Sequence, residues 1–122
     1  MNPATSGSPP HDRLIAEAEA ALGRLPARDT DVARLLRVSL VALRRAASGA
    51  ASTSDPDEAR FLWTYCAESE SALQAALREL WRRRRLSRTE FERLQATAVA
   101  ARRHRNRAFL EAQRGVIAAT CN

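Results

Sequence analysis

The chain has 122 residues, of which 45% are hydrophobic, and a formal net charge of +6, but only two Trp, one Tyr and three Phe are aromatic. This length fits one domain that buries a core without disulfide or metal staples. The lack of β-branched and aromatic runs argues against a β-sheet. Ala-rich, Leu-spaced and Gly-poor sequence favours helices, so we expect an all-α protein.

The composition of the chain changes after the first ten residues, and the first predicted helix follows this change. Residues 1–10 are rich in Ser, Gly and Pro and lack the apolar region of a signal peptide, so we expect a disordered N-terminal arm. A helix is predicted from about His11 to Arg24 and is ended by Pro26. Its residues at helical spacing are Leu14, Ala18, Ala21, Leu22 and Leu25.

A second helix is predicted to begin at Asp29 or Asp31, because either side chain can accept hydrogen bonds from the free N–H groups of a first turn. Gly49 is the expected C-terminal stop, and the small, polar segment 48–54 is expected to be a loop. The apolar stripe of this helix is Val32, Leu35, Leu36, Leu40, Leu43, Ala46 and Ala47.

The third helix has the clearest start, with Asp55 as the cap, Pro56 at the first helical position and Glu58 placed as in a capping box. We expect it to run to about Arg85. One stripe contains Leu62, Cys66, Ser69, Leu73, Leu77 and Leu80, and a second contains Phe61, Tyr65, Ala72 and Ala76. If Phe61 and Tyr65 are in the core, Trp63 points away from them. It is then an interface anchor or the second side of a wide buried face.

The fourth helix is predicted to start at a second capping box, from Ser87 to Glu90. Its inner face contains Phe91, Leu94, Ala98, Ala101, Ala108, Phe109 and Ala112, and residues 117–122 are expected to fray. The very short connection forces the third and fourth helices to lie antiparallel. We therefore expect residues 11–116 to form an antiparallel up-down-up-down four-helix bundle.

All 20 basic residues are Arg, and none is Lys. GC-rich codon usage can explain this choice, but every cation is nevertheless a planar, permanently charged group suited to phosphate and carboxylate. Residues 1–77 carry 8 Arg and 10 acidic residues, whereas residues 78–122 carry 12 Arg and 4 acidic residues. This basic C-terminal part is expected to meet a polyanion or an acidic protein.

Ten arginines are the candidate nucleic-acid-binding residues. They are Arg78, Arg82, Arg83, Arg84, Arg85 and Arg88 at the corner between the third and fourth helices, and Arg102, Arg103, Arg105 and Arg107 within the fourth. The functional interpretation is a phosphate-binding surface. The structural alternatives are compensation of a helix dipole, solvated charge, or internal ion pairs in which Glu68 and Glu70 face Arg102 and Arg103. For residues 102–107, a charged stripe at a subunit interface is a further alternative.

Catalytic residues are not expected. The sequence has no Gly-rich phosphate loop, nucleophile elbow or His-Glu-x-x-His motif. The pairs Glu17/Glu19 and Glu68/Glu70 are spaced so that their members point to different helix faces, which prevents joint acid–base work.

We also expect no metal and no cofactor, because no group of Cys, His, Asp and Glu has the spacing of zinc ligands, and His11 and His104 are far apart in sequence. Cys66 and Cys121 are too few for a disulfide framework and fit a reducing, cytoplasmic location. No apolar run is long enough to span a membrane.

Short motifs follow one another in a recognisable order between residues 14 and 112. They are Leu25-Pro26, Leu40-x-x-Leu43-x-x-Ala46, Arg60-Phe61-Leu62-x-x-x-x-Ala67-Glu68-Ser69, Leu73-x-x-x-Leu77 and Leu86-Ser87-x-x-Glu90. This order resembles two related groups of four-helix bundle proteins. One is encoded in intervening sequences of large-subunit ribosomal RNA genes. The other is the accessory variability determinant (Avd) of diversity-generating retroelements.

The resemblance implies a pentameric ring with a basic surface, and for the Avd type it implies nucleic-acid binding and association with a reverse transcriptase. Two segments depart from the pattern. Residues 102–107 are Arg-rich where the family has small residues. Residues 48–52 replace the Asn-Ile-Ala-Glu-Gly-like loop of the ribosomal group, and this second departure favours the retroelement type.

These observations predict a non-catalytic, homo-oligomeric accessory protein that binds RNA or DNA through the ten arginines, as a partner of a reverse transcriptase or similar enzyme. The alternative is an adaptor or regulator whose basic face docks an acidic partner protein. The sequence does not distinguish RNA from DNA.

Overall fold

The computed structural model describes residues 9–121, and these form an all-helical fold without strands. The four α-helices are α2 (Pro10–Leu22), α3 (Thr30–Ser52), α4 (Pro56–Arg82) and α5 (Arg88–Thr120), and a short 3-10 helix, η1 (Ala27–Asp29), precedes α3. The all-α prediction is confirmed. The arm expected at residues 1–10 lies, except for Pro9 and Pro10, outside the described residues.

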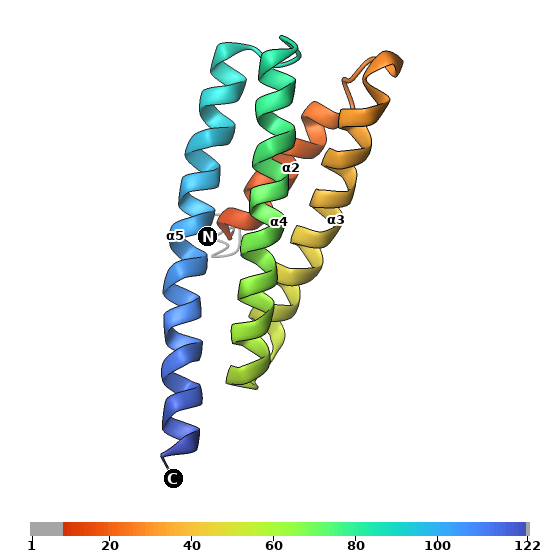
Figure 1. Cartoon of the computed structure of the whole chain (residues 1–122). Helices are drawn as coiled ribbons and strands as arrows, with labels where there is room; N and C mark the ends of the chain where they lie inside the picture. The colour runs from red at the N-terminus through yellow and green to blue at the C-terminus, as the bar shows by residue number, and fades with distance from the viewer. Residues whose placement is uncertain (1–8, 122) are drawn as a thin grey trace, which may run out of the picture.

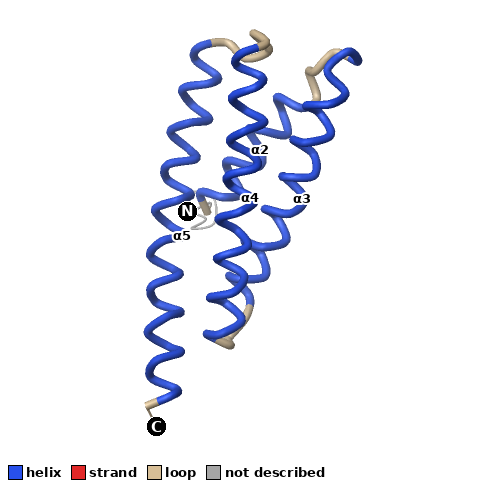
Figure 2. The backbone as a smooth tube through the Cα atoms, viewed as in Figure 1, coloured by secondary structure: helices blue, strands red, loops and turns tan. Residues whose placement is uncertain are grey.

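Each helix packs against its neighbour in the chain, and α2 also packs against α5. Figure 1 shows α3, α4 and α5 as long helices side by side, with the shorter α2 behind them, and α5 extending past the others at its C-terminal end. Short loops join the helices at the ends of the molecule (Figure 2). No helix in residues 9–121 combines the length and apolar character needed to cross a membrane.

Both strong helix starts expected from the sequence are confirmed, but among the described residues Glu58 does not complete a capping box with Asp55. The Asp55 carboxylate accepts a hydrogen bond from the backbone N–H of Asp57 at 3.0 Å, with Pro56 at the first helical position of α4. At the start of α5, Ser87 Oγ accepts from the Glu90 N–H at 3.1 Å, and the Glu90 carboxylate accepts from the Ser87 N–H at 3.0 Å. Such reciprocal bonds satisfy N–H groups that a first helical turn leaves without partners.

The end of α4 is a Schellman motif, in which the N–H of Arg85 reaches the carbonyl of Leu80 at 2.8 Å and the N–H of Arg84 reaches that of Trp81 at 3.0 Å. Arg84 occupies the left-handed position of this motif, with φ of 61°. Glycine is the usual residue there, because a side chain in this conformation crowds the backbone. The turn places Arg84 at the exposed corner between α4 and α5.

The core lies between the four helices and contains most of the expected apolar residues. Its fully buried larger members include Leu14, Leu36, Leu43, Leu73, Leu77 and Leu80. The second stripe expected on α4 is wrong at its start, because Phe61 is 69% exposed and Tyr65 is also exposed. Trp63 is buried instead, at 5% exposure. Relative to the expected orientation, α4 is therefore rotated about its axis, so that Trp63 faces the core while Phe61 and Tyr65 face away from it.

Several helix ends differ from expectation. Gly49 does not end α3, which continues to Ser52, so residues 48–52 are helical. A Cβ at Gly49 would lie 3.2 Å from the side chain of Leu62, so the glycine permits a close approach of α3 to α4. Helix α4 ends at Arg82, and α5 extends to Thr120. Leu35, expected in the apolar stripe of α3, is exposed.

Candidate functional site

Arg83 at the end of α4 is held by three carboxylates. Its Nη1 lies 3.0 Å from Asp29 Oδ1, its Nη2 lies 2.7 Å from Asp31 Oδ2, and its Nε lies 2.7 Å from Glu79 Oε2. Asp29 is buried. Burial raises the pKa of Asp29, but hydrogen bonds from Arg83 and Arg85 outweigh it and lower the pKa overall. Arg83 is therefore an internal structural cation.

Three more arginines of the corner cluster are also paired. Arg85 Nε lies 2.6 Å from Asp29 Oδ2, and Arg88 Nε lies 3.0 Å from Glu92 Oε1. Arg82 contacts Glu79, with Nε 3.0 Å from Oε1. Hydrogen bonds from Arg82, and then from Arg83, lower the pKa of Glu79 to about 2.

In the second cluster, Arg105 turns inward and its Nε lies 2.8 Å from Glu70 Oε2. Glu70 therefore pairs with Arg105, and the ion pairs expected between Glu70 and Arg102 or Arg103 are not formed within residues 9–121. Glu68 is exposed.

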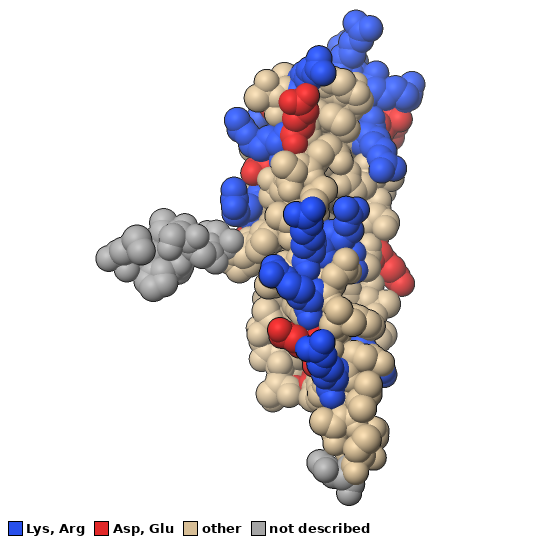
Figure 3. All heavy atoms as spheres, turned by 90° about the vertical axis from the view of Figure 1, so that its left-hand side faces the viewer, with Lys and Arg blue, Asp and Glu red and all other residues tan. Residues whose placement is uncertain are grey.

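The other five candidate arginines are exposed and form no ion pair within residues 9–121. They are Arg78, Arg84, Arg102, Arg103 and Arg107. Arg103, Arg107 and Arg114 are spaced at i, i+4 and i+11, so they share one face of α5. Basic side chains gather along this side of the molecule, mixed with fewer acidic ones (Figure 3).

A pocket of about 290 Å³ lies between α4 and α5, with Leu14 of α2 in its lining. Its polar lining consists of Glu70, Ser71, Gln74, Arg78, Gln95, Arg102 and Arg105. Gln95 Nε2 donates to Gln74 Oε1 at 2.9 Å, which links the two helices across the pocket. Because Glu70 balances Arg105, the charges of Arg78 and Arg102 remain in excess in the pocket. The lining can therefore donate several hydrogen bonds to an anion.

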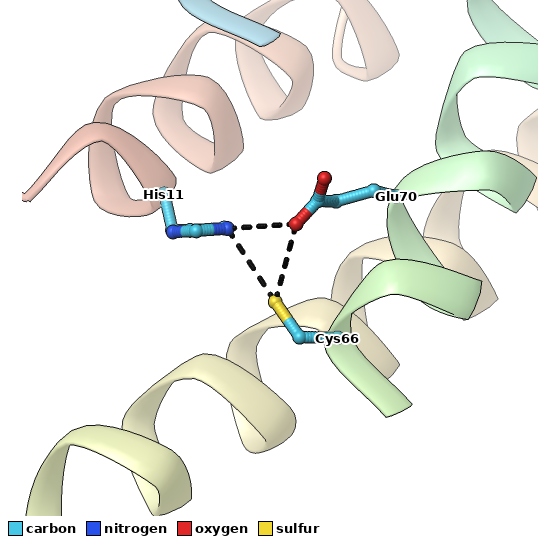
Figure 4. A group of neighbouring side chains, drawn as sticks. All are labelled: His11, Cys66 and Glu70. Carbon is cyan, nitrogen blue, oxygen red and sulfur yellow. Dashed lines mark hydrogen bonds and ion pairs between the residues drawn. The ribbon is translucent and has the colours of Figure 1, made fainter. Parts of the chain in front are cut away.

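A buried polar cluster lies beside this pocket, where His11 of α2 meets Cys66 and Glu70 of α4 (Figure 4). His11 Nε2 is 3.0 Å from Glu70 Oε2, and Cys66 Sγ is 3.4 Å from each of these two atoms. His11 is 2% exposed, and the Glu70 side chain is 11% exposed. All three side chains thus converge on one point.

Aromatic rings and a cation surround the cluster. The rings of His11, Trp63 and His104 pack together, with centroid distances of 5.7–5.9 Å. Burial, and then the charge of Glu70, raises the pKa of the Cys66 thiol. Burial also raises the pKa of Glu70, but hydrogen bonds from His11 and Arg105 lower it overall. The raised pKa of Cys66 favours the thiol form, and the lowered pKa of Glu70 favours the ionised carboxylate.

Sequence reasoning missed this cluster, because no local motif contains it. Cys66 and Glu70 are four residues apart and share a helix face, which is the only local signal. His11 lies 55 residues before Cys66 and joins it only through packing of α2. The expectation of no metal ligands rested on sequence spacing alone. Such spacing does not reveal a group of potential ligands that comes from two separate helices.

The chain matches no protein-family model, no curated protein and no solved structure. The resemblance to the Avd and ribosomal intervening-sequence groups therefore stays a prediction.

Proposed function

We propose that the protein is a non-catalytic accessory protein that binds nucleic acid through the pocket between α4 and α5 and the arginines around it. The observation that carries this proposal is the convergence of Arg78 and Arg102 on one pocket, without a carboxylate partner for either in residues 9–121. A phosphodiester offers the bidentate acceptor that a guanidinium group prefers.

The face formed by Arg103, Arg107 and Arg114 extends the binding surface along α5. At about 1.5 Å per residue, this face covers about 16 Å, which spans several charges of a nucleic-acid backbone. Arg84 adds a cation at the corner, in a backbone conformation that a side chain makes unfavourable. An exposed arginine in this conformation supports a role for its charge in binding. The candidate nucleic-acid-binding residues thus narrow to Arg78, Arg84, Arg102, Arg103 and Arg107, because Arg82, Arg83, Arg85, Arg88 and Arg105 form ion pairs within the fold.

The proposal includes the antiparallel up-down-up-down connectivity. It is supported by contacts that join early residues of one helix to late residues of another. Between α2 and α5, the carboxylate of Glu17 accepts from Thr97 Oγ1 at 3.2 Å, and Arg24 pairs with Glu90. Between α4 and α5, Arg60 donates to Gln113 at 3.2 Å, whereas Gln74 meets Gln95.

The biological setting is proposed from the resemblance stated above, which implies a homo-oligomer, a pentamer, that works with a reverse transcriptase. The exposed side chains of Leu35, Val38 and Val41, spaced along one face of α3, support contacts between copies. A reducing, cytoplasmic location fits the free Cys66 and Cys121. Light scattering measures the subunit number, and a monomer would count against the resemblance.

The test compares two variants that lose the same formal charge. The first replaces Arg78, Arg102, Arg103 and Arg107 with Gln. The matched control replaces Arg24, Arg44, Arg82 and Arg88, each of which pairs with a carboxylate. Binding to unrelated RNA and DNA, single-stranded and duplex, is measured by fluorescence anisotropy at several salt concentrations.

We expect the first variant to bind much more weakly and its duplex-DNA salt slope to be shallower by about 3.6, from about 0.9 for each lost phosphate contact. The control should lose less affinity, and circular dichroism should show that both remain helical. Equal losses of nucleic-acid affinity in the two variants would mean that binding depends on net charge alone and not on the unpaired arginines. If the wild type binds no nucleic acid, the alternative of an acidic protein partner takes its place.

A further inference from the structure

We propose that His11, Cys66 and Glu70 bind a zinc ion that ties the first turn of α2 to α4. The three side chains offer an imidazole nitrogen, a thiolate sulfur and a carboxylate oxygen, all of which zinc accepts. They come from two helices, and their ligand atoms all lie within 4.8 Å of one another (Figure 4). Glu70 also lines the pocket proposed to bind nucleic acid, but none of the arginines proposed to hold phosphate is a ligand of the ion.

The spacing of the ligand atoms is close to what tetrahedral zinc requires. Zinc bonded to nitrogen, oxygen and sulfur at ordinary lengths places these ligand atoms about 3.3 to 3.5 Å apart. The observed separations are 3.0 Å between His11 Nε2 and Glu70 Oε2, and 3.4 Å from Cys66 Sγ to each of them. A small outward movement of His11 and Glu70 would admit the ion, so little reorganisation opposes binding.

The donor set also favours zinc over other common divalent ions. Magnesium and calcium prefer oxygen ligands alone, whereas a thiolate together with an imidazole suits zinc. Three protein ligands leave one tetrahedral position for a solvent oxygen. The pocket between α4 and α5 reaches Glu70, which gives the ion and its water a path from solvent.

Arg105 would act next to the ion as a positioning residue. Its Nε already binds Glu70 Oε2 at 2.8 Å, and the second carboxylate oxygen lets this hydrogen bond shift when zinc arrives. Binding is balanced as follows. The Nε2 hydrogen that His11 donates to Glu70 moves through solvent to Nδ1, so that the Nε2 lone pair of the neutral ring binds zinc. Ionised Glu70 donates an oxygen, and Cys66 releases its thiol proton to solvent as the sulfur–zinc bond forms.

The test uses the full chain without an affinity tag, stripped of metal by a chelator and then titrated with cobalt(II) as a spectroscopic substitute for zinc. We expect a thiolate-to-cobalt charge-transfer band that saturates at one ion per chain and disappears when zinc is added. Thermal unfolding with zinc should show a raised melting temperature.

Variants assign the ligands. Cys66→Ser and His11→Gln should lose the band and the zinc-dependent rise in melting temperature, whereas Cys121→Ser, which changes the exposed cysteine, should keep both. Absence of the band in the wild-type chain would overturn the proposal, and this measurement does not depend on the folding of any variant. Loss of the band in Cys121→Ser with retention in Cys66→Ser would equally overturn it.

Discussion

Arg83 donates a hydrogen bond to the buried carboxylate of Asp29, although the two residues lie 54 positions apart in the sequence. The contact joins the end of α4 to the start of α3, and Arg85 binds the other oxygen of the same carboxylate. A buried carboxylate needs such cationic partners, because leaving water without them is costly. Part of the Arg cluster at the corner therefore stabilises the fold and is not available to a ligand.

Replacing Arg83 with Gln should lower the melting temperature by several degrees, and replacing Arg82 with Gln should change it little. Arg83 contacts three carboxylates, including buried Asp29, whereas Arg82 contacts Glu79 alone and is 73% exposed. Breaking a pair that leaves a charge buried is destabilising, but exposed ion pairs contribute little. Thermal unfolding followed by circular dichroism measures both, and equal shifts would contradict the assignment.

The same network should make the fold sensitive to acid. Its contacts lower the pKa of Glu79 from 4.5 to about 2, and the hydrogen bond from Arg83 lowers the pKa of Asp31. A carboxylate whose pKa is lowered by folding stabilises the folded state above its unfolded pKa. This stabilisation should be complete above about pH 5 and lost as the pH falls toward about 2.

Urea unfolding across this acid range measures the effect. Arg83→Gln should unfold with a weaker dependence on pH than the wild type, since the variant lacks the partner that lowers the pKa of Asp31. If both chains lose stability in parallel as the pH falls, other carboxylates are responsible.

Arg84→Gly should stabilise the fold and weaken nucleic-acid binding at once. Glycine removes the steric cost of the left-handed conformation, a gain of about 1 kcal/mol. It also removes one unpaired cation, so the salt slope on duplex DNA should become shallower by about 0.9. Arg84→Gln is the matched control, because it loses the charge but keeps the strained backbone. A control as stable as Arg84→Gly would show that backbone strain is not the cause.

The starts of α4 and α5 were predictable because their determinants are local, whereas Asp29 before α3 makes no side-chain cap and binds the distant Arg83 and Arg85 instead. The caps at Asp55 and Ser87 act within three residues, and both were read directly from the sequence. The rotation of α4 about its axis was not predictable from the sequence, because Phe61 and Trp63 are both large and apolar. Only the packing of α2 and α5 decides which of the two is buried.

The candidate site was predictable only as a set of arginines. Which of them stay unpaired depends on distant carboxylates, such as Asp29 for Arg83 and Glu70 for Arg105. Composition gives the surplus of positive charge, but it does not say where that surplus remains after folding. The pocket and the buried cluster arise from contacts between helices and have no signature at any one position.

Trp63→Ala should destabilise the fold by about 3 to 5 kcal/mol, the cost typical of removing a buried large aromatic side chain. Trp63 packs against the rings of His11 and His104, so the change also loosens the attachment of α2. Phe61→Ala, two residues earlier, should change stability by less than about 0.5 kcal/mol, because Phe61 is largely exposed. Urea unfolding at low protein concentration compares the two variants.

The same pair also tests contacts between copies of the chain. If Phe61 lies at such a contact, Phe61→Ala should lower the mass measured by light scattering while leaving unfolding at low concentration unchanged. A large loss of stability in Phe61→Ala at low concentration, together with a small one in Trp63→Ala, would mean that the opposite face of α4 is buried.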